Sequence, residues 1–321
     1  MRNTPKVQIV IFLCGVMVCT FLWNYLSLKI VLTGRDFTEK YDRNPSYPWE
    51  GDPECEHFVV QLAERDTLLN WPLTSFPGSG ITWTRQLIEG VTGIYTGSVY
   101  EGDPSPVKSK RSRIVTDDPR CGCTIMDKDH EATLNNGLWH YFQLLHREGL
   151  GGLIHQQYDR RGVLLLRNPM DVVFTFRNWA YSGKVGIAPP EAFTGPSWDE
   201  TIDFVAYVWA DHAIRWIEQI EKGTVIFYEK LLGSNADVEI ERLLHAISFF
   251  PVDRERLKCT IKHRNRTDHK RLNNPRFFLE PQHQMKMMKS IHKVQESLRR
   301  RNWPRLPVYL FDFHNPDDRK P

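Results

Sequence analysis

The order of apolar and polar positions along the chain predicts alternating strands and helices. Short apolar runs predict strands at 67–76, 123–128, 162–168 and 224–228. The run at 162–168 is continuously apolar until Arg167, as in a strand buried on both faces. Helical periodicity predicts helices at 81–93, 131–148, 170–181, 199–221, 236–249 and 282–301. This alternation predicts an α/β fold with a parallel sheet and helices on both faces.

The longest uncharged stretch lies near the N-terminus, between Lys6 and Lys29. Its 22 residues are enough to span a bilayer as a helix. A cleaved signal peptide is the alternative, but the stretch exceeds a usual signal and no small-residue cleavage site follows it. We expect one domain after a polar, proline-containing stem. The expected parts are a cytoplasmic tail at 1–6, a transmembrane signal-anchor at 7–28, a stem at 29–56 and a lumenal domain at 57–321.

The orientation of the predicted span is not decided by charge, because basic residues lie on both sides of it. Asn265-Arg266-Thr267 is a glycosylation sequon, which is modified only on the lumenal side. We therefore expect a single-pass type II membrane protein with a glycan at Asn265. The sequence leaves the oligomeric state open.

Composition is that of an ordinary globular protein, with 41% apolar and 25% charged residues. A net charge of +3 argues against a nucleic-acid partner. The charge is uneven, because residues 254–271 and 286–305 are each strongly basic. Such stretches suggest an anionic ligand or anionic lipid, although 286–305 could equally be a solvated helix face.

Four cysteines lie outside the predicted span: Cys55, Cys121, Cys123 and Cys259. One or two disulfides are expected in a lumenal compartment, and their pairing cannot be deduced from the sequence. A Cys-x-Cys pair such as Cys121 and Cys123 seldom closes on itself. We expect no zinc there, because no second pair of Cys or His residues lies nearby at ligand spacing.

A glycine-rich turn, Ser75 to Trp83, lies between a predicted strand and a predicted helix. Its backbone N–H groups and the following helix N-terminus could surround a phosphate. It is no Walker A loop, because no Gly-Lys-Ser/Thr follows. Taken alone, the turn is equally consistent with a plain tight turn.

Two further motifs follow predicted strands. Arg167-Asn168-Pro169-Met170-Asp171 ends the buried strand, where an arginine can meet a ligand in the crevice. Thr175 lies two turns further on and offers a hydroxyl. Lys128-Asp129-His130-Glu131 follows a short strand, so His130 is a candidate general base with Lys128 as electrostatic helper. A lone histidine in such a place is more often structural.

The order and spacing of these motifs resemble those of sulfotransferases. Pro77 to Trp83 is similar to the 5′-phosphosulfate loop, usually Pro-Lys-Ser-Gly-Thr-Thr-Trp. Arg167 and Thr175 are eight residues apart, as are the Arg and Ser of the 3′-phosphate element, and Tyr228-Glu229-Lys230-Leu231 is also family-like. Over roughly residues 70–305 the chain resembles the WSCD family of membrane-anchored sulfotransferase-like proteins, as a short arthropod-type member without WSC modules.

The resemblance implies a P-loop-type sheet of the sulfotransferase fold, the donor 3′-phosphoadenylyl sulfate and an acceptor among sialylated glycans. We expect a Golgi location, which itself suggests a glycan acceptor. We expect no metal, because a sulfuryl group carries less charge than a phosphoryl group and basic residues can serve. His130 and Lys128 would be catalytic. The residues implied to bind the donor are Pro77, Gly78, Ser79, Gly80, Ile81, Thr82, Trp83, Arg167 and Thr175, with Lys270 and Arg271 from a C-terminal loop.

One departure from the pattern keeps an alternative open. Gly78 stands where cytosolic sulfotransferases place a lysine that contacts the sulfuryl group. The alternative is therefore a catalytically inactive, membrane-tethered module that binds glycan or nucleotide. A kinase acting on ATP is a weaker option, because the chain lacks the Walker A lysine.

Overall fold

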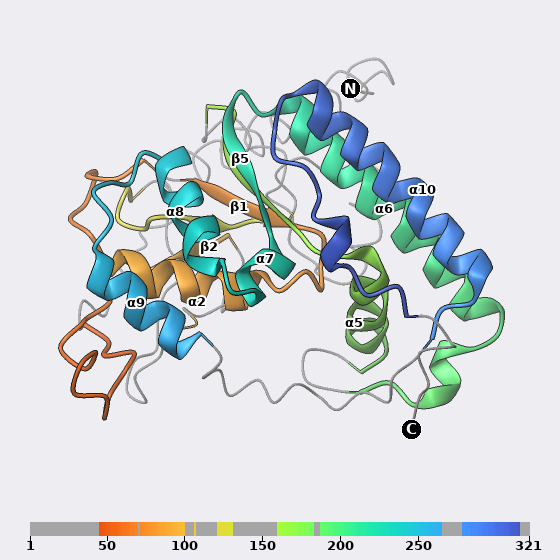
Figure 1. The fold of residues 1–321 in the computed structure, drawn as a ribbon, viewed down its shortest axis with the longest axis horizontal. Helices are drawn as coiled ribbons and strands as arrows, with labels where there is room; N and C mark the ends of the chain where they lie inside the picture. The colour runs from red at the N-terminus through yellow and green to blue at the C-terminus, as the bar shows by residue number, and fades with distance from the viewer. Residues whose placement is uncertain are drawn as a thin grey trace, which may run out of the picture. The chain divides into compact units, whose positions relative to one another are not determined.

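The computed structural model describes residues 45–69, 71–99, 106, 121–130, 159–182, 187–264 and 278–314. Within them, five parallel strands form one sheet in the order β2-β3-β1-β4-β5 (Figure 1). The strands are β1 (Pro72–Ser75), β2 (Gly97–Ser98), β3 (Asp127–Lys128), β4 (Arg161–Leu166) and β5 (Lys222–Phe227). The predicted parallel α/β fold is therefore confirmed.

Helices cover both faces of this sheet. On one side lie α2 (Ile81–Thr92), α8 (Ala236–Ala246) and α9 (Arg254–His263). On the other side lie α5 (Pro169–Ser182), α6 (Pro196–Gln219) and α10 (Pro281–Arg300). Three short helices complete the described elements: α7 (Tyr228–Leu232), η1 (Pro190–Phe193) and η2 (Val308–Leu310).

The burial of β4 on both faces of the sheet explains why its sequence is continuously apolar. Val163 and Leu165 belong to the hydrophobic cluster of the α2 side, whereas Leu164 and Leu166 belong to that of the α6 side. Successive side chains of a strand point to opposite faces, so a strand covered on both faces needs apolar residues throughout. The predicted helix at 199–221 is also confirmed, and its apolar stripe packs into the α6-side cluster.

Other boundaries differ from the sequence expectation. The strands predicted at 67–76 and 123–128 pair in the sheet only at 72–75 and 127–128. Leu68 instead donates a backbone hydrogen bond to Gly122, so these two stretches are joined outside the sheet. Helix α9 was not predicted, because its apolar positions are few among basic residues. Asp253 caps it by accepting from the backbone N–H of Arg256 at 3.0 Å.

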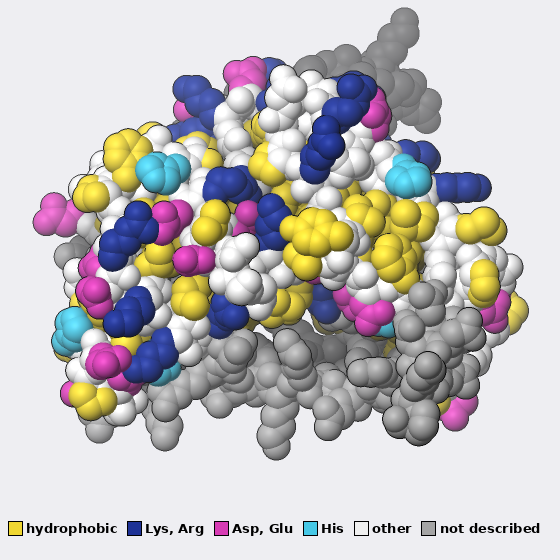
Figure 2. Space-filling view, in the orientation of Figure 1, with side chains coloured by type: hydrophobic (Ala, Val, Ile, Leu, Met, Phe, Trp, Pro, Cys, Tyr) yellow, Lys and Arg dark blue, Asp and Glu magenta, His cyan; other side chains and the backbone are white. Residues whose placement is uncertain are grey.

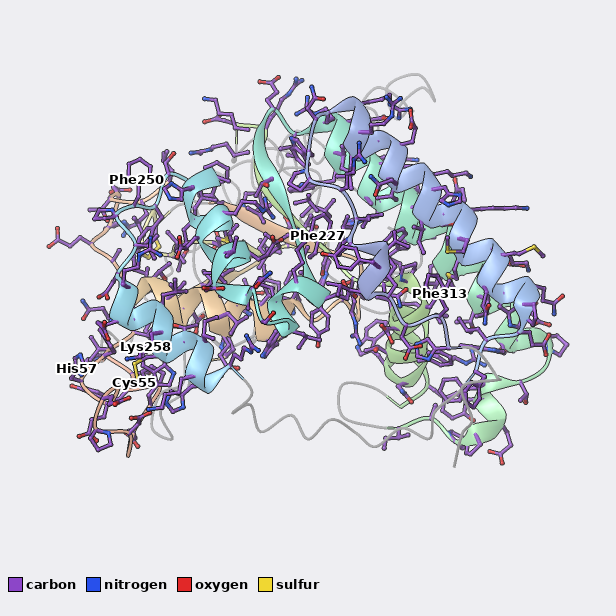
Figure 3. The ribbon with its side chains drawn as sticks, viewed as in Figure 1. Cys55, His57, Phe227, Phe250, Lys258 and Phe313 are labelled. Atoms are coloured by element: carbon purple, nitrogen blue, oxygen red, sulfur yellow. A yellow bond between two sulfur atoms is a disulfide. The ribbon has the colours of Figure 1, made fainter. Side chains whose placement is uncertain are left out.

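The end of the predicted stem that the structure describes, residues 45–56, packs on α9. Cys55 forms a disulfide with Cys259, and both are buried beside Trp49 and Phe58 (Figure 3). A second disulfide joins Cys121 and Cys123. The expectation that this pair does not close on itself is therefore wrong: the left-handed backbone of Gly122, at φ +56°, brings the two cysteines together.

Metal-ligating side chains gather at Asp52, Cys55 and His263 within the described residues. The sulfur of Cys55 is already in the disulfide. The ammonium group of Lys262 lies 2.9 Å from Asp52, where a cation would sit, and its hydrogen bond lowers the pKa of Asp52 to about 2. His263 also bonds Asp52, at 2.6 Å. This cluster therefore joins the N-terminal segment to α9 by ion pairing.

Several expectations concern residues outside the described part of the chain. They are the tail and span at 1–28, the helix at 131–148, the sequon at Asn265, and Lys270 and Arg271. Among residues that the structure does describe, no helix is long and apolar enough to cross a membrane.

Candidate nucleotide-binding site

The candidate site lies at the carboxyl edge of the sheet, where β1 has neighbours on both sides. After β1 the chain continues to β2 and β3, which lie on one side of it, and then crosses to β4 on the other side. Such a switch in strand order opens a crevice in which ligands of α/β proteins bind. The three predicted motifs follow β1, β3 and β4, so the fold brings them to one edge.

The loop after β1 depends on two glycines in the left-handed region. Gly78 has φ +88° and Gly80 has φ +90°. A Cβ on Gly78 would lie 3.3 Å from the Cβ of Thr175, and one on Gly80 would lie 2.4 Å from the ring of Tyr228. The loop is therefore packed against α5 and α7, and a lysine at position 78 would meet both a strained backbone and Thr175.

The loop also offers unsatisfied donors. Gly80 is the N-cap residue of α2 and provides no side-chain cap, so the first N–H groups of the helix remain available to an anion. Ser79 is buried, and its Oγ makes no hydrogen bond with any described residue. Ile81 points into the core, so only its backbone could face a ligand. Pro77 and Thr82 are half-buried.

Arg167 joins the first and second motifs. Its Nη1 donates to the carbonyl oxygen of Gly78 at 2.9 Å and lies 3.5 Å from Thr175 Oγ1. Its guanidinium group lies over the ring of Tyr228, 4.6 Å from the centroid. Its Nε makes no hydrogen bond within the described residues. The arginine is thus held beside the loop with donor capacity left for a ligand.

Trp83 lies in the first turn of α2 and packs beside the glycine loop. Its ring lies edge-on to Tyr228, with centroids 5.2 Å apart. Its Nε1 donates to the backbone oxygen of Arg264 at 2.8 Å. Trp83 and Tyr228 therefore give the site a partly exposed aromatic wall beside Arg167.

Asn168, which is fully buried, uses its backbone and side chain to hold four segments. Its backbone N–H donates to Glu229 at 2.7 Å, and its Nδ2 donates to the carbonyl of Asp312 at 2.7 Å and to Asp171 at 3.2 Å. Its Oδ1 accepts from the N–H of Met170 at 3.1 Å. The end of β4, α5, α7 and the C-terminal segment therefore meet at this one side chain.

Asp171 connects the hydrogen bonds of Asn168 to Thr175, which belongs to the predicted 3′-phosphate element. Its side chain bonds His314 at 2.8 Å, and its backbone oxygen accepts from Thr175 Oγ1 at 3.2 Å. Burial raises the pKa of Asp171, but the hydrogen bond from His314 and the charge of Arg167 outweigh it and leave the pKa below its usual value. Asp171 is therefore ionised near neutral pH and attracts Arg167.

His130 lies across the loop, after β3. Its Nδ1 is 2.8 Å from the carbonyl oxygen of Ser75. A carbonyl can only accept, so Nδ1 carries the proton and Nε2 carries the lone pair of the neutral ring. Lys128 pairs in register with Leu73, so both predicted catalytic residues flank β1. The imidazole ring is thus oriented by the strand that precedes the glycine loop.

Many of the described lysines and arginines in the two basic stretches lie beside acidic side chains. On α9 and α10, several lysines and arginines are ion-paired, and Figure 2 shows blue and magenta side chains interspersed over the α9 side. This favours the interpretation of 286–305 as a solvated helix face. These ion pairs are Arg254–Glu241, Lys258–Glu255, Lys262–Glu54, Lys286–Asp203, Arg299–Glu296 and Arg300–Glu218.

Sequence reasoning missed the supporting residues of the site. Asn168 lies inside the Arg-Asn-Pro motif and Glu229 lies inside Tyr-Glu-Lys-Leu. Both motifs are visible in the sequence, but neither indicates the supporting hydrogen bonds of these two residues. His314 had none, because it lies more than 140 residues from Asp171 and beyond the resembling region.

Comparison with curated proteins finds relatives that match part of the chain. WSCD family members of Aedes aegypti, Drosophila pseudoobscura pseudoobscura and Drosophila melanogaster are 28%, 27% and 25% identical over 193 residues. The chain is related to the WSCD family. The matches cover 59% of this chain and 53% of each relative, so the chain spans about half the length of these WSCD proteins. The predicted resemblance is confirmed.

No protein-family model matches the chain. Among solved structures, mouse sulfotransferase SULT7A1 complexed with PAP matches with a TM-score of 0.44 and 14% identity. That match covers 72% of this WSCD relative and 84% of the mouse chain.

The role of Asn168 can be tested with a nearly isosteric change. Asn168→Asp replaces the two donors of Nδ2 by acceptors that face Asp171 and the Asp312 carbonyl. We expect it to lower the free energy of unfolding by about 2–4 kcal/mol, because buried oxygen acceptors would then face one another with no donor between them. Urea unfolding at pH 7 measures this.

Asn235→Asp is the matched control, since Asn235 also precedes a helix but is exposed. We expect it to change stability by less than about 0.5 kcal/mol. Equal stability of the two variants would contradict the role given to Asn168.

Proposed function

We propose that this chain is a sulfotransferase that moves the sulfuryl group of 3′-phosphoadenylyl sulfate to a hydroxyl group of a glycan. The observation that carries the proposal is the contact of Arg167 with both Gly78 and Thr175. Two motifs that are 89 residues apart at Gly78 and Arg167 thereby meet at one anion-binding edge. The relationship to WSCD proteins supports the same class of reaction.

The residues fit a donor with two anionic ends. The N–H groups of Gly78, Gly80 and Ile81 and the unpartnered Ser79 hydroxyl suit the 5′-phosphosulfate, whereas the N–H of Ser79 donates to the carbonyl oxygen of Phe76 at 3.2 Å. The guanidinium group of Arg167 and the hydroxyl of Thr175 suit the 3′-phosphate. Trp83 and Tyr228 offer two aromatic rings, set edge-on to each other, beside these groups. We assign Lys270 and Arg271 to the same nucleotide on the resemblance alone.

The reaction then needs a base and a stabilised transferring group. The acceptor oxygen bonds to sulfur while the bond between sulfur and the 5′-phosphate oxygen breaks. The hydroxyl proton passes to His130 Nε2, and the bond electrons leave with adenosine 3′,5′-bisphosphate. Lys128 stabilises charge on the transferring group, and positioning supplies much of the rate, as in phosphoryl transfer.

We further propose that the domain is lumenal in the Golgi, anchored by residues 7–28 as a type II protein and glycosylated at Asn265. The uncharged length of that stretch and the sequon support this arrangement. We propose a glycan acceptor because glycans are the abundant hydroxyl acceptors of that compartment.

A second candidate is an inactive nucleotide- or glycan-binding module. The geometry at Gly78 favours it, because the lysine of the cytosolic enzymes cannot be restored there without strain. The two candidates share the nucleotide site and differ in whether sulfate is transferred.

Nucleotide binding tests what the two candidates share. Adenosine 3′,5′-bisphosphate at one hundred times its Kd should stabilise the protein by about 2.7 kcal/mol, measured as a rise in Tm. Arg167→Ala should remove most of this rise. Arg160→Ala, which removes the same charge from an exposed site at the opposite end of β4, should keep it. Equal stabilisation by adenosine 5′-phosphate in the wild type would mean that no 3′-phosphate site exists.

Turnover tests the role of His130. With labelled donor and a glycan array, His130→Ala should lose at least about 10²-fold in kcat, because a positioned base contributes roughly that much. Its nucleotide affinity should stay near that of the wild type. His245→Ala, at an exposed position on α8, is the control. Full activity of His130→Ala would assign the base elsewhere, and an inactive wild type that binds nucleotide would favour the binding module.

Topology is tested in microsomes. The domain should resist added protease until detergent is present, and Asn265→Gln should remove a glycan-dependent shift in mobility. Digestion of the domain in intact microsomes would reverse the proposed orientation.

A further inference from the structure

Glu229 is a half-buried residue at the candidate site whose carboxyl group the proposed reaction does not use. It lies in the first turn of α7, directly after β5. Its Oε1 accepts the backbone N–H of Asn168 at 2.7 Å, next to Arg167. Its Oε2 is buried and has no hydrogen-bond partner among the described residues. One carboxylate oxygen is thus used in positioning, while the other is enclosed without a donor.

The charged groups around Glu229 come from three segments. Arg167, at the end of β4, favours its ionised form, whereas Asp171, on α5, opposes it. Lys230, which follows it on α7, forms an ion pair with Glu239 at 3.9 Å. Burial is the largest influence and raises the pKa of Glu229 to about 7, against the hydrogen bond from Asn168.

We infer that Glu229 is a positioning residue that takes up a proton when an anionic nucleotide binds to Arg167. The inference rests on the proposed function, because it needs a phosphate at that arginine. A bound phosphate would share the guanidinium charge that stabilises the Glu229 anion, and it would add negative charge nearby. A proton from solvent would then bond to Oε2, while Oε1 continues to accept from Asn168.

Linkage between proton binding and nucleotide binding gives the direction in which the affinity changes with pH. A carboxyl group with a raised pKa in the folded protein contributes stability at low pH that is lost as the pH rises through about 7. Nucleotide binding that favours the protonated form must therefore weaken as the pH rises above about 7, where the unliganded protein has lost the proton that the complex retains. Glu229→Gln keeps an oxygen acceptor for Asn168 and cannot titrate, so it should remove this dependence.

The experiment is calorimetric titration of the full chain in detergent with adenosine 3′,5′-bisphosphate, at pH 6.5 and 8.5. Two buffers of different protonation enthalpy give the number of protons taken up. The wild type should take up more protons than Glu229→Gln at pH 8.5. Its affinity should fall about tenfold relative to that variant between the two pH values. Protons exchanged by the nucleotide's own phosphates are common to both proteins and cancel.

Two further variants separate positioning from titration. Glu229→Ala leaves the Asn168 N–H without its acceptor, so affinity should fall about tenfold at both pH values, and Glu229→Gln should restore most of it at pH 6.5. Glu221→Gln makes the same change at an exposed site at the start of β5 and should match the wild type.

The outcomes are distinguishable. Equal proton uptake by the wild type and Glu229→Gln would overturn the inference and leave the proposed function intact. A wild type that binds no nucleotide at either pH would overturn the proposed function and the inference with it. Should Glu229→Gln fail to fold, the wild type decides at pH 8.5, where the nucleotide's phosphates are already ionised: an absence of proton uptake there would overturn the inference.

Discussion

The hydrogen bonds of Asn168 are the constraint on which the candidate site depends. This one buried residue ties the end of β4 to α5, α7 and the C-terminal segment. Arg167 precedes it directly, so the bonds of Asn168 hold the backbone from which the guanidinium group reaches Gly78 and Tyr228. A buried polar side chain with its groups satisfied specifies one arrangement of its neighbours, because each alternative leaves a donor or acceptor unpaired.

The glycine loop shows how packing decides which chemistry is available. Because Gly78 lies in the left-handed region against Thr175, the loop contributes backbone N–H groups and a hydroxyl but no side-chain cation. Among the described residues, positive charge at this edge therefore comes from neighbouring strands, with Arg167 after β4 and Lys128 at β3. Asp171 is ionised beside Arg167 and offsets part of that charge. An anionic ligand competes with this carboxylate for the arginine.

The sequence predicted the parts of this arrangement that follow from local pattern. A continuous apolar run identified β4, and the motifs after β1, β3 and β4 converge because carboxyl ends of parallel strands share an edge. The sequence could not predict His314 or the Asp312 carbonyl as partners, since no pattern links a C-terminal segment to α5. It also missed the closure of Cys121 on Cys123, which depends on the positive φ of Gly122. Contacts made by long-range folding leave no local signature.

The same kind of long-range contact ties two segments of the C-terminal third to the site. The backbone oxygen of Arg264 accepts a hydrogen bond from Trp83 at the glycine loop. Leu279 donates to the carbonyl oxygen of His314, whose ring bonds Asp171. Both halves of the site are therefore bonded to residues that follow α8 in the sequence. A ligand that moves Trp83 or Asp171 must also act on Arg264 or His314, because each hydrogen bond transmits the displacement of its partner.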